Sequence, residues 1–175
     1  MTDSRLDRLW AGWRNAFVTG AAGDTTEGCV FCALLASGLP DPETHILWRH
    51  PDGLAFAILN AYPYTSGHLM VMPTRHVGEL ELLGGDESAA VWSGLAAAVQ
   101  AIKAAYHPDG LNLGANLGRV AGAGVPSHFH MHVLPRWMGD TNFMTAVADT
   151  RVLPEALSDS DTKLRAAWPA AGAWP

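Results

Sequence analysis

The stretch at residues 128–134 constrains the fold more than any other part of the chain, because three histidines alternate there with apolar residues. It reads His-Phe-His-Met-His-Val-Leu. In an extended strand, successive side chains point to opposite faces of the sheet. We therefore expect His128, His130 and His132 on one face and the apolar residues between them on the core face. Imidazoles in such a row can bind a metal, move protons at neutral pH or attack an electrophile.

A loop of small residues, 121–127, comes directly before this strand and reads Ala-Gly-Ala-Gly-Val-Pro-Ser. Small side chains leave the backbone N–H groups of a loop accessible to an anion such as phosphate. For a glycine-rich loop considered alone, a tight connection into the strand is the simpler interpretation. Its position before three histidines on one face favours phosphate binding.

The rest of the pattern predicts hairpins and one long helix. Further strands are expected at 45–49, 54–59, 68–72 and 111–116. Apolar residues at helical spacing predict the main helix over 86–106, capped by Asp86 or Ser88, and a short helix is expected near 33–36. The segment 77–83 fits a short helix, a turn or an edge strand. Hairpins with one long helix predict an α+β domain with an antiparallel sheet of about five strands.

Both ends of the chain carry further predicted elements. Apolar residues at helical spacing predict an amphipathic helix before residue 20, followed by a flexible connector; they are Leu6, Leu9, Trp10, Trp13 and Phe17. At the other end we expect an edge segment at 151–154, a short helix over 155–167 and a loosely ordered end.

The composition limits the function classes. A chain of 175 residues that is 49% hydrophobic and 16% charged is long enough for one buried core and too short to argue for two. The net charge of −6 argues against a general nucleic-acid binder. No apolar run approaches a membrane span and no leader is evident, so we expect a cytoplasmic protein without a membrane partner. In a reducing compartment, Cys29 and Cys32 suggest a metal pair or free thiols before a disulfide.

The stretch at 128–134 matches the signature of the histidine triad (HIT) nucleotide-binding proteins, in which histidines alternate with apolar residues. Residues 60–73 resemble the upstream strand pair of this family, and the likeness extends over roughly 28–144. Segments 121–124 and 135–144 resemble the branch that contains bacterial diadenosine tetraphosphate phosphorylases.

The resemblance implies a HIT-like fold and a homodimer. It divides the chain into an N-terminal helix and connector at 1–27, a nucleotide-binding domain at 28–144 and a C-terminal extension at 145–175.

Histidine chemistry suits phosphoryl transfer, because a neutral imidazole can attack phosphorus in line and the resulting phosphoramidate breaks readily. The resemblance implies that His130 is the nucleophile that forms a nucleotidyl-histidine, and that His132 helps to transfer a proton at the leaving oxygen. His128 is the first histidine of the triad. A metal site or three hydrogen-bonded strand histidines are the alternatives.

Several other residues are expected to contact the nucleotide or to support the triad. Backbone N–H groups near Gly124 and Val125 would stabilise phosphate oxygens, and the resemblance places Asn60 near the ribose. Asn60 can equally form a turn, Asn116 can cap a strand end and Trp137 can simply pack. The full expected set is Asn60, His68, Asn116, Gly122, Gly124, Val125, Ser127, Trp137 and Asn142.

A second group of residues resembles the zinc site of some family members. It comprises Cys29, Cys32, His76 and His128, and two sulfurs with two imidazoles suit tetrahedral zinc. The zinc would be structural, and no cofactor is expected for catalysis. Against a metal site, buried cysteines are also common as small hydrophobic residues.

The function expected from the resemblance is cleavage of a nucleoside polyphosphate, diadenosine tetraphosphate first, at the α-phosphate. Inorganic phosphate or water would resolve the nucleotidyl-histidine. One alternative is a hydrolase of nucleoside phosphoramidates or other mononucleotide conjugates. Another is a nucleotide-binding partner or sensor whose turnover is incidental.

Overall fold

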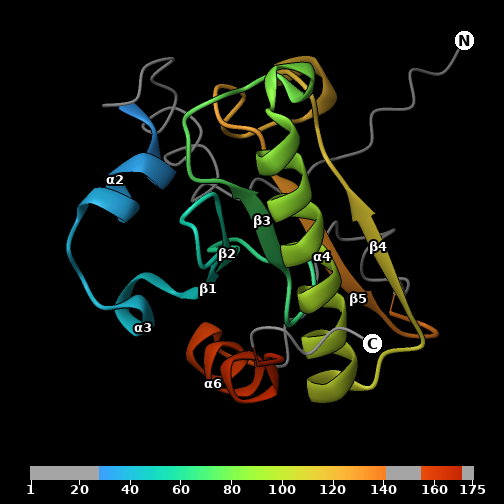
Figure 1. Cartoon of the computed structure of the whole chain (residues 1–175). Coiled ribbons are helices and arrows are strands. Elements are labelled where there is room, and N and C mark those ends of the chain that lie inside the picture. Colours follow the sequence, from blue (N-terminus) through green and yellow to red (C-terminus); the bar gives the residue numbers. More distant parts are fainter. Residues whose placement is uncertain (1–27, 141–154, 171–175) are drawn as a thin grey trace, which may run out of the picture.

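The computed structural model of the chain describes residues 28–140 and 155–170. The predicted N-terminal amphipathic helix, the segment at 151–154 and the end beyond residue 170 lie outside the described residues. Figure 1 shows a sheet with the long helix α4 across it and helix α6 beside the C-terminal end of α4.

The sheet has five antiparallel strands in the order β1-β2-β3-β5-β4. This confirms the predicted α+β fold and the predicted number of strands. The strand ends differ from the predicted ones by at most three residues. The strands are β1 (Ile46–Arg49), β2 (Ala55–Leu59), β3 (Leu69–Pro73), β4 (Gly110–Gly114) and β5 (Met131–Arg136).

The two central strands β2 and β3 are buried along their whole length, because helices cover both faces of the sheet. Alternate residues such as Ala57 and Val71 join the core formed with α4 (Gly85–Tyr106) and α6 (Leu157–Ala167). Their neighbours Ile58 and Met70 join a second cluster with α2 (Val30–Ala36) on the other face. Side chains alternate along each strand between two faces. One face packs against α4 and α6, and the other packs against α2 and carries the histidines.

Helix α4 begins one residue before the predicted start, and its cap differs from the prediction. Neither Asp86 nor Ser88 caps it. The N-cap is Gly84, whose N–H donates to the carboxylate of Glu87 at 2.9 Å. A glutamate at the third helical position reaches back to the first turn and satisfies an N–H there.

The shorter helices fall close to where the sequence placed them. The short helix predicted near residues 33–36 is α2, and the one predicted over 155–167 is α6. The ambiguous segment 77–83 contains a 3-10 helix, Leu80–Leu82. The four-residue helix α3, Asp41–Thr44, and a 3-10 turn at Arg119–Ala121 were not predicted.

The triad segment is only partly a strand, which corrects the prediction. Strand β5 begins at Met131, so His128 and His130 lie before the ladder. The ladder stops because the carbonyl of Pro73, where the partner strand ends, faces Nε2 of His128 at 2.9 Å. The Phe129 N–H donates instead to the carbonyl of Val77 at 2.6 Å.

Within the described residues, no helix combines the length and the apolar character that crossing a membrane requires.

Gly94 allows α4 to approach the sheet closely. A Cβ atom there would lie 2.7 Å from the ring of Trp48 and 2.8 Å from the side chain of Val71. We predict that Gly94→Val lowers the free energy of unfolding by about 1–3 kcal/mol in urea denaturation, because the added methyl groups overpack the core. Gly85→Val is the matched control, since nothing lies within 4 Å of a Cβ there; an equal loss in both variants would contradict the close packing.

Candidate active site

The three triad histidines lie on the face of the sheet that α4 does not cover, as the alternation predicts. Phe129 and Val133 are buried in the core under α4, and Met131 packs against it. His128 is fully buried and His130 is 5% exposed. Same-face placement therefore holds even though only part of the segment is a regular strand.

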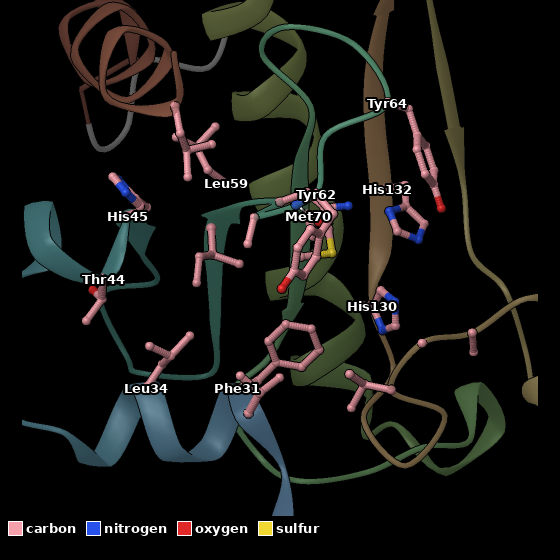
Figure 2. A pocket seen from close by; sticks show the side chains of 18 of the residues that line it. Phe31, Leu34, Thr44, His45, Leu59, Tyr62, Tyr64, Met70, His130 and His132 are labelled. Atoms are coloured by element: carbon pink, nitrogen blue, oxygen red, sulfur yellow. Dashed lines mark hydrogen bonds between the residues drawn. The ribbon is translucent and has the colours of Figure 1, made fainter. Parts of the chain in front are cut away.

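His130 and His132 line a cavity of about 540 Å³. Figure 2 shows these two histidines on one side of the cavity and Thr44 and His45 on the other, with Phe31 among the apolar side chains between them. The complete lining consists of Val30, Phe31, Leu34, Glu43, Thr44, His45, Ile58, Leu59, Asn60, Ala61, Tyr62, Tyr64, Met70, Arg119, Gly122, Ala123, Gly124, Val125, His130, His132 and Leu157. An elongated, mostly apolar cavity with polar groups at its ends suits a nucleotide.

The hydrogen bond of His130 fixes which of its ring nitrogens carries the proton. Its Nδ1 lies 2.8 Å from the carbonyl of His128. A carbonyl only accepts, so Nδ1 carries the hydrogen and Nε2 keeps its lone pair in the neutral ring. His130 therefore presents a nucleophilic nitrogen.

A chain of three hydrogen bonds gives His132 the opposite tautomer. The Tyr64 N–H donates to Nδ1 of His68 at 3.0 Å, so Nε2 of His68 carries the hydrogen. That nitrogen lies 3.0 Å from Nδ1 of His132, which must accept. Nε2 of His132 then carries a hydrogen, and His132 can donate to an oxygen in the cavity. His68 is fully buried, and its hydrogen bond orients His132.

Burial lowers the pKa of all three triad imidazoles, because a weakly polar interior disfavours the charged ring. The pKa of His132 falls to about 4, with a smaller contribution from His130. That of His128 also falls to about 4. Near neutral pH the rings are uncharged, so the tautomers assigned from the hydrogen bonds are the forms present.

The small-residue loop turns its backbone toward the cavity. The N–H groups of Gly122 and Ala123 donate to the carbonyls of Arg119 and Gly118 within the loop. The N–H groups of Gly124 and Val125 donate to no other described residue, and both residues line the cavity. Such amides can bind an anion without adding a formal charge.

Asn60 forms a turn and also lines the cavity, so its position fits both the turn and the ribose contact considered for it. Its side-chain oxygen accepts from the Tyr62 N–H at 3.0 Å, which forms the turn after β2. Its amide nitrogen lies 3.4 Å from the ring nitrogens of His68, and Asn60 lines the cavity. The turn holds the side chain where a ligand can reach it.

Three of the remaining predicted nucleotide contacts are absent from the cavity lining. Asn116 follows β4 and donates to the carbonyl of Gly122 at 3.4 Å, so it braces the loop. Trp137 packs edge-on against Tyr106, with ring centroids 6.3 Å apart. Ser127, the last residue of the loop, is half-buried. Asn142 lies outside the described residues.

Four side chains from distant parts of the chain form a compact group that can hold a metal. The ligand atoms of Cys29, Cys32, His76 and His128 lie within 4.8 Å of one another. Nδ1 of His128 faces Cys29 Sγ at 3.4 Å, because Nε2 donates to the Pro73 carbonyl. Burial and the neighbouring Cys29 raise the pKa of the Cys32 thiol to about 11. Two sulfurs and two imidazoles at these positions fit tetrahedral zinc.

Sequence reasoning missed several residues of the cavity. Phe31 and Tyr62 lie in its middle and His45 lies across from the triad (Figure 2), while Arg119, just before the loop, and Leu157 also line it. Tyr62 falls inside the segment 60–73 already singled out, so it could have been found. Leu157 belongs to α6, and no local pattern indicates that this helix reaches the cavity.

The comparisons with known proteins agree with the geometry. The model of the HIT domain matches residues 43–138, which is more than half of the chain. The chain belongs to the HIT family. The AP-4-A phosphorylase of Mycobacterium tuberculosis is 45% identical over 170 residues, covering 94% of this chain and 85% of that protein.

Solved structures of HIT proteins share the fold. A zinc-bound histidine triad family protein from Mycobacterium smegmatis is 29% identical with a TM-score of 0.65, covering 82% of this chain and 94% of that one. A hypothetical histidine triad nucleotide-binding protein from Sulfolobus tokodaii is 28% identical with a TM-score of 0.63, covering 79% and 91%. Together with the family match, they support a nucleotide-processing enzyme.

The opposite tautomers of His130 and His132 can be tested directly. We predict that ¹⁵N-resolved imidazole NMR finds the hydrogen on Nδ1 of His130 and on Nε2 of His132. Because the pKa of His132 is about 4, its signals should stay those of a neutral ring from about pH 8 to about pH 5.5, where a free histidine peptide titrates. The same tautomer in both rings, or titration of His132 like the peptide, would contradict the assignment.

Proposed function

We propose that this protein cleaves nucleoside polyphosphates, diadenosine tetraphosphate first, at the α-phosphate through a nucleotidyl-His130 intermediate. The observation that carries the proposal is the pairing of opposite tautomers. His130 offers a lone pair and His132 offers an N–H, with ring centroids 5.0 Å apart on the wall of one cavity. A nucleophile beside a hydrogen-bond donor is the arrangement that displacement at phosphorus needs.

In the first step, Nε2 of His130 forms a bond to the α-phosphorus and the bond to the bridging oxygen breaks. The ring of His130 becomes positively charged, and its Nδ1–H stays bonded to the carbonyl of His128. The departing polyphosphate leaves as an anion and accepts a hydrogen bond from Nε2–H of His132. The free N–H groups of Gly124 and Val125 stabilise charge on the phosphate oxygens.

In the second step, an oxygen of inorganic phosphate attacks the same phosphorus and the N–P bond breaks, which returns the electron pair to His130. An anionic phosphate oxygen needs no base to remove a proton, whereas water does. With diadenosine tetraphosphate, the products are ATP from the first step and ADP from the second. The 45% identity to a protein named AP-4-A phosphorylase supports this choice of substrate and acceptor.

The apolar middle of the cavity supports a nucleotide as the ligand. Phe31, Ile58 and Met70 offer a surface for a base, and Asn60, beside His68, also lines the cavity, where its amide can bind ribose hydroxyls.

The first test is product analysis after incubation with diadenosine tetraphosphate, with and without inorganic phosphate. We expect ADP and ATP only when phosphate is present. His130→Ala should lower turnover about a thousand-fold or more, as loss of a nucleophile does. His107→Ala, on an exposed histidine after α4, is the matched control. AMP with ATP in either buffer would contradict phosphate as acceptor, and turnover retained by His130→Ala would contradict the intermediate.

We also propose that Cys29, Cys32, His76 and His128 hold a structural zinc ion. The zinc would link α2 to the triad segment, because Cys29 and His128 are 99 residues apart in the sequence. It would take no part in the transfer steps, because Nδ1 of His128 faces the cysteines rather than the cavity.

The zinc proposal predicts about one equivalent of zinc by elemental analysis and a lower melting temperature after removal by a chelator. His76→Gln should lose most of the zinc, because one of four ligands is gone. His107→Gln should keep it, since that residue is remote from the four ligands. A protein purified in zinc-containing buffer that carries no metal, or equal zinc content in both variants, would contradict the site.

A further inference from the structure

The cavity has a polarity that orients a nucleotide within it. Of the described residues that line it, Arg119 lies at the beginning of the loop that carries Gly124 and Val125, while Glu43 lies beside His45. The phosphates are therefore attracted toward the loop and the triad, and the carboxylate at the other end repels them. An oriented nucleotide has its base against the apolar middle of the cavity, with the outer edge of the base toward Thr44 and His45.

His45 is held at this end by the C-terminal helix. Its Nδ1 lies 3.2 Å from a carboxylate oxygen of Asp161 in α6, and the side chain of Asp161 is only 10% exposed. A carboxylate accepts, so Nδ1 donates and Nε2 of the neutral ring keeps a lone pair. Nε2 has no partner among the described residues, and the His45 side chain is 32% exposed at the cavity. Figure 2 places His45 across the cavity from His130 and His132.

The position of Asp161 is itself fixed by its neighbours. Arg165 donates to both of its carboxylate oxygens at 2.9 Å. The same guanidinium donates to the backbone carbonyls of Asp41 and Ile46, on either side of His45, at 3.2 and 2.8 Å. These bonds join α6 to the segment that carries His45.

The backbone of His45 is also constrained. It has a φ of +57°, in the left-handed region that side chains other than glycine adopt infrequently. Its N–H donates to the carbonyl of Asp41, and its carbonyl accepts from the Leu59 N–H. The imidazole is therefore held by backbone and side-chain bonds together, which suits a residue that contacts a ligand.

We infer that His45, positioned by Asp161 of the C-terminal helix, selects a 6-amino purine over a 6-oxo purine at the base end of the cavity. The inference rests on the proposed nucleotide-processing function. Nε2 of His45 accepts a hydrogen bond, and the exposed side chain of Glu43, two residues before it, also lines the cavity. The amino group of adenine donates to Nε2, whereas the carbonyl of hypoxanthine places an acceptor against it. Two facing acceptors form no hydrogen bond and repel each other, so the discrimination comes from repulsion as well as attraction.

The test compares the binding of AMP and IMP by isothermal titration calorimetry at about pH 8, because these mononucleotides differ only at the purine edge and need no turnover. We expect the wild-type protein to bind AMP about ten-fold or more tightly than IMP. His45→Phe should lower AMP affinity to about that of IMP and leave IMP binding nearly unchanged. His107→Phe is the matched control, because His107 also has a positive φ, at the exposed end of α4.

A second variant separates positioning from folding. Asp161→Ala removes the carboxylate that holds the hydrogen on Nδ1 of His45, so the ring is no longer fixed with Nε2 as an acceptor and the preference for AMP should fall. A folding defect would instead lower the affinity for both nucleotides together.

Three results would overturn the inference while leaving the proposed function intact. They are equal wild-type binding of AMP and IMP, an AMP preference that survives His45→Phe, and an undiminished AMP preference in Asp161→Ala. A wild-type protein that binds neither nucleotide would contradict the proposed function itself.

Discussion

The hydrogen bond from Nε2 of His128 to the carbonyl of Pro73 is the interaction on which both candidate centres depend. It ends the pairing between β3 and β5, so the chain leaves the ladder before His130. It also turns Nδ1 of His128 toward Cys29 and Cys32, where a metal can bind. The backbone carbonyl of the same residue holds Nδ1 of His130, which leaves the other nitrogen of that ring free to attack. One buried imidazole thus connects the group that can hold a metal to His130, the proposed nucleophile.

The chemistry of the site depends on the triad imidazoles being neutral and on which ring nitrogen of each carries the hydrogen. Burial keeps the triad imidazoles uncharged, and each ring then depends on a backbone or side-chain partner for its tautomer. His130 obtains its tautomer from a carbonyl. His132 obtains the opposite one through His68, whose own orientation is set by the Tyr64 N–H. A backbone N–H can only donate a hydrogen bond. The Tyr64 N–H therefore fixes the direction of every hydrogen bond in the chain that runs through His68 to His132.

The C-terminal helix belongs to the cavity as well as to the core. Leu164 is fully buried against the sheet and α4, while Leu157 and Asp161 reach the cavity and His45. The HIT domain match ends at residue 138, before this helix begins. The extension therefore supplies a wall and a polar anchor that the matched domain alone lacks. A segment of this kind can alter which base the cavity accepts while the triad stays unchanged.

The sequence by itself determined the five-stranded α+β fold, the long helix and the shared face of the three histidines, because each depends on a local period of two or of 3.6 residues. It also indicated the candidate metal group, the cysteine pair from its spacing and the two histidines only through the family resemblance. The tertiary structure decided the tautomer of His132, since His68 and Tyr64 lie far from the triad in sequence. It also turned Asn116 toward the loop, packed Trp137 against Tyr106 and brought α6 to His45. Contacts between distant segments depend on how the elements pack, and no short pattern in the chain encodes them.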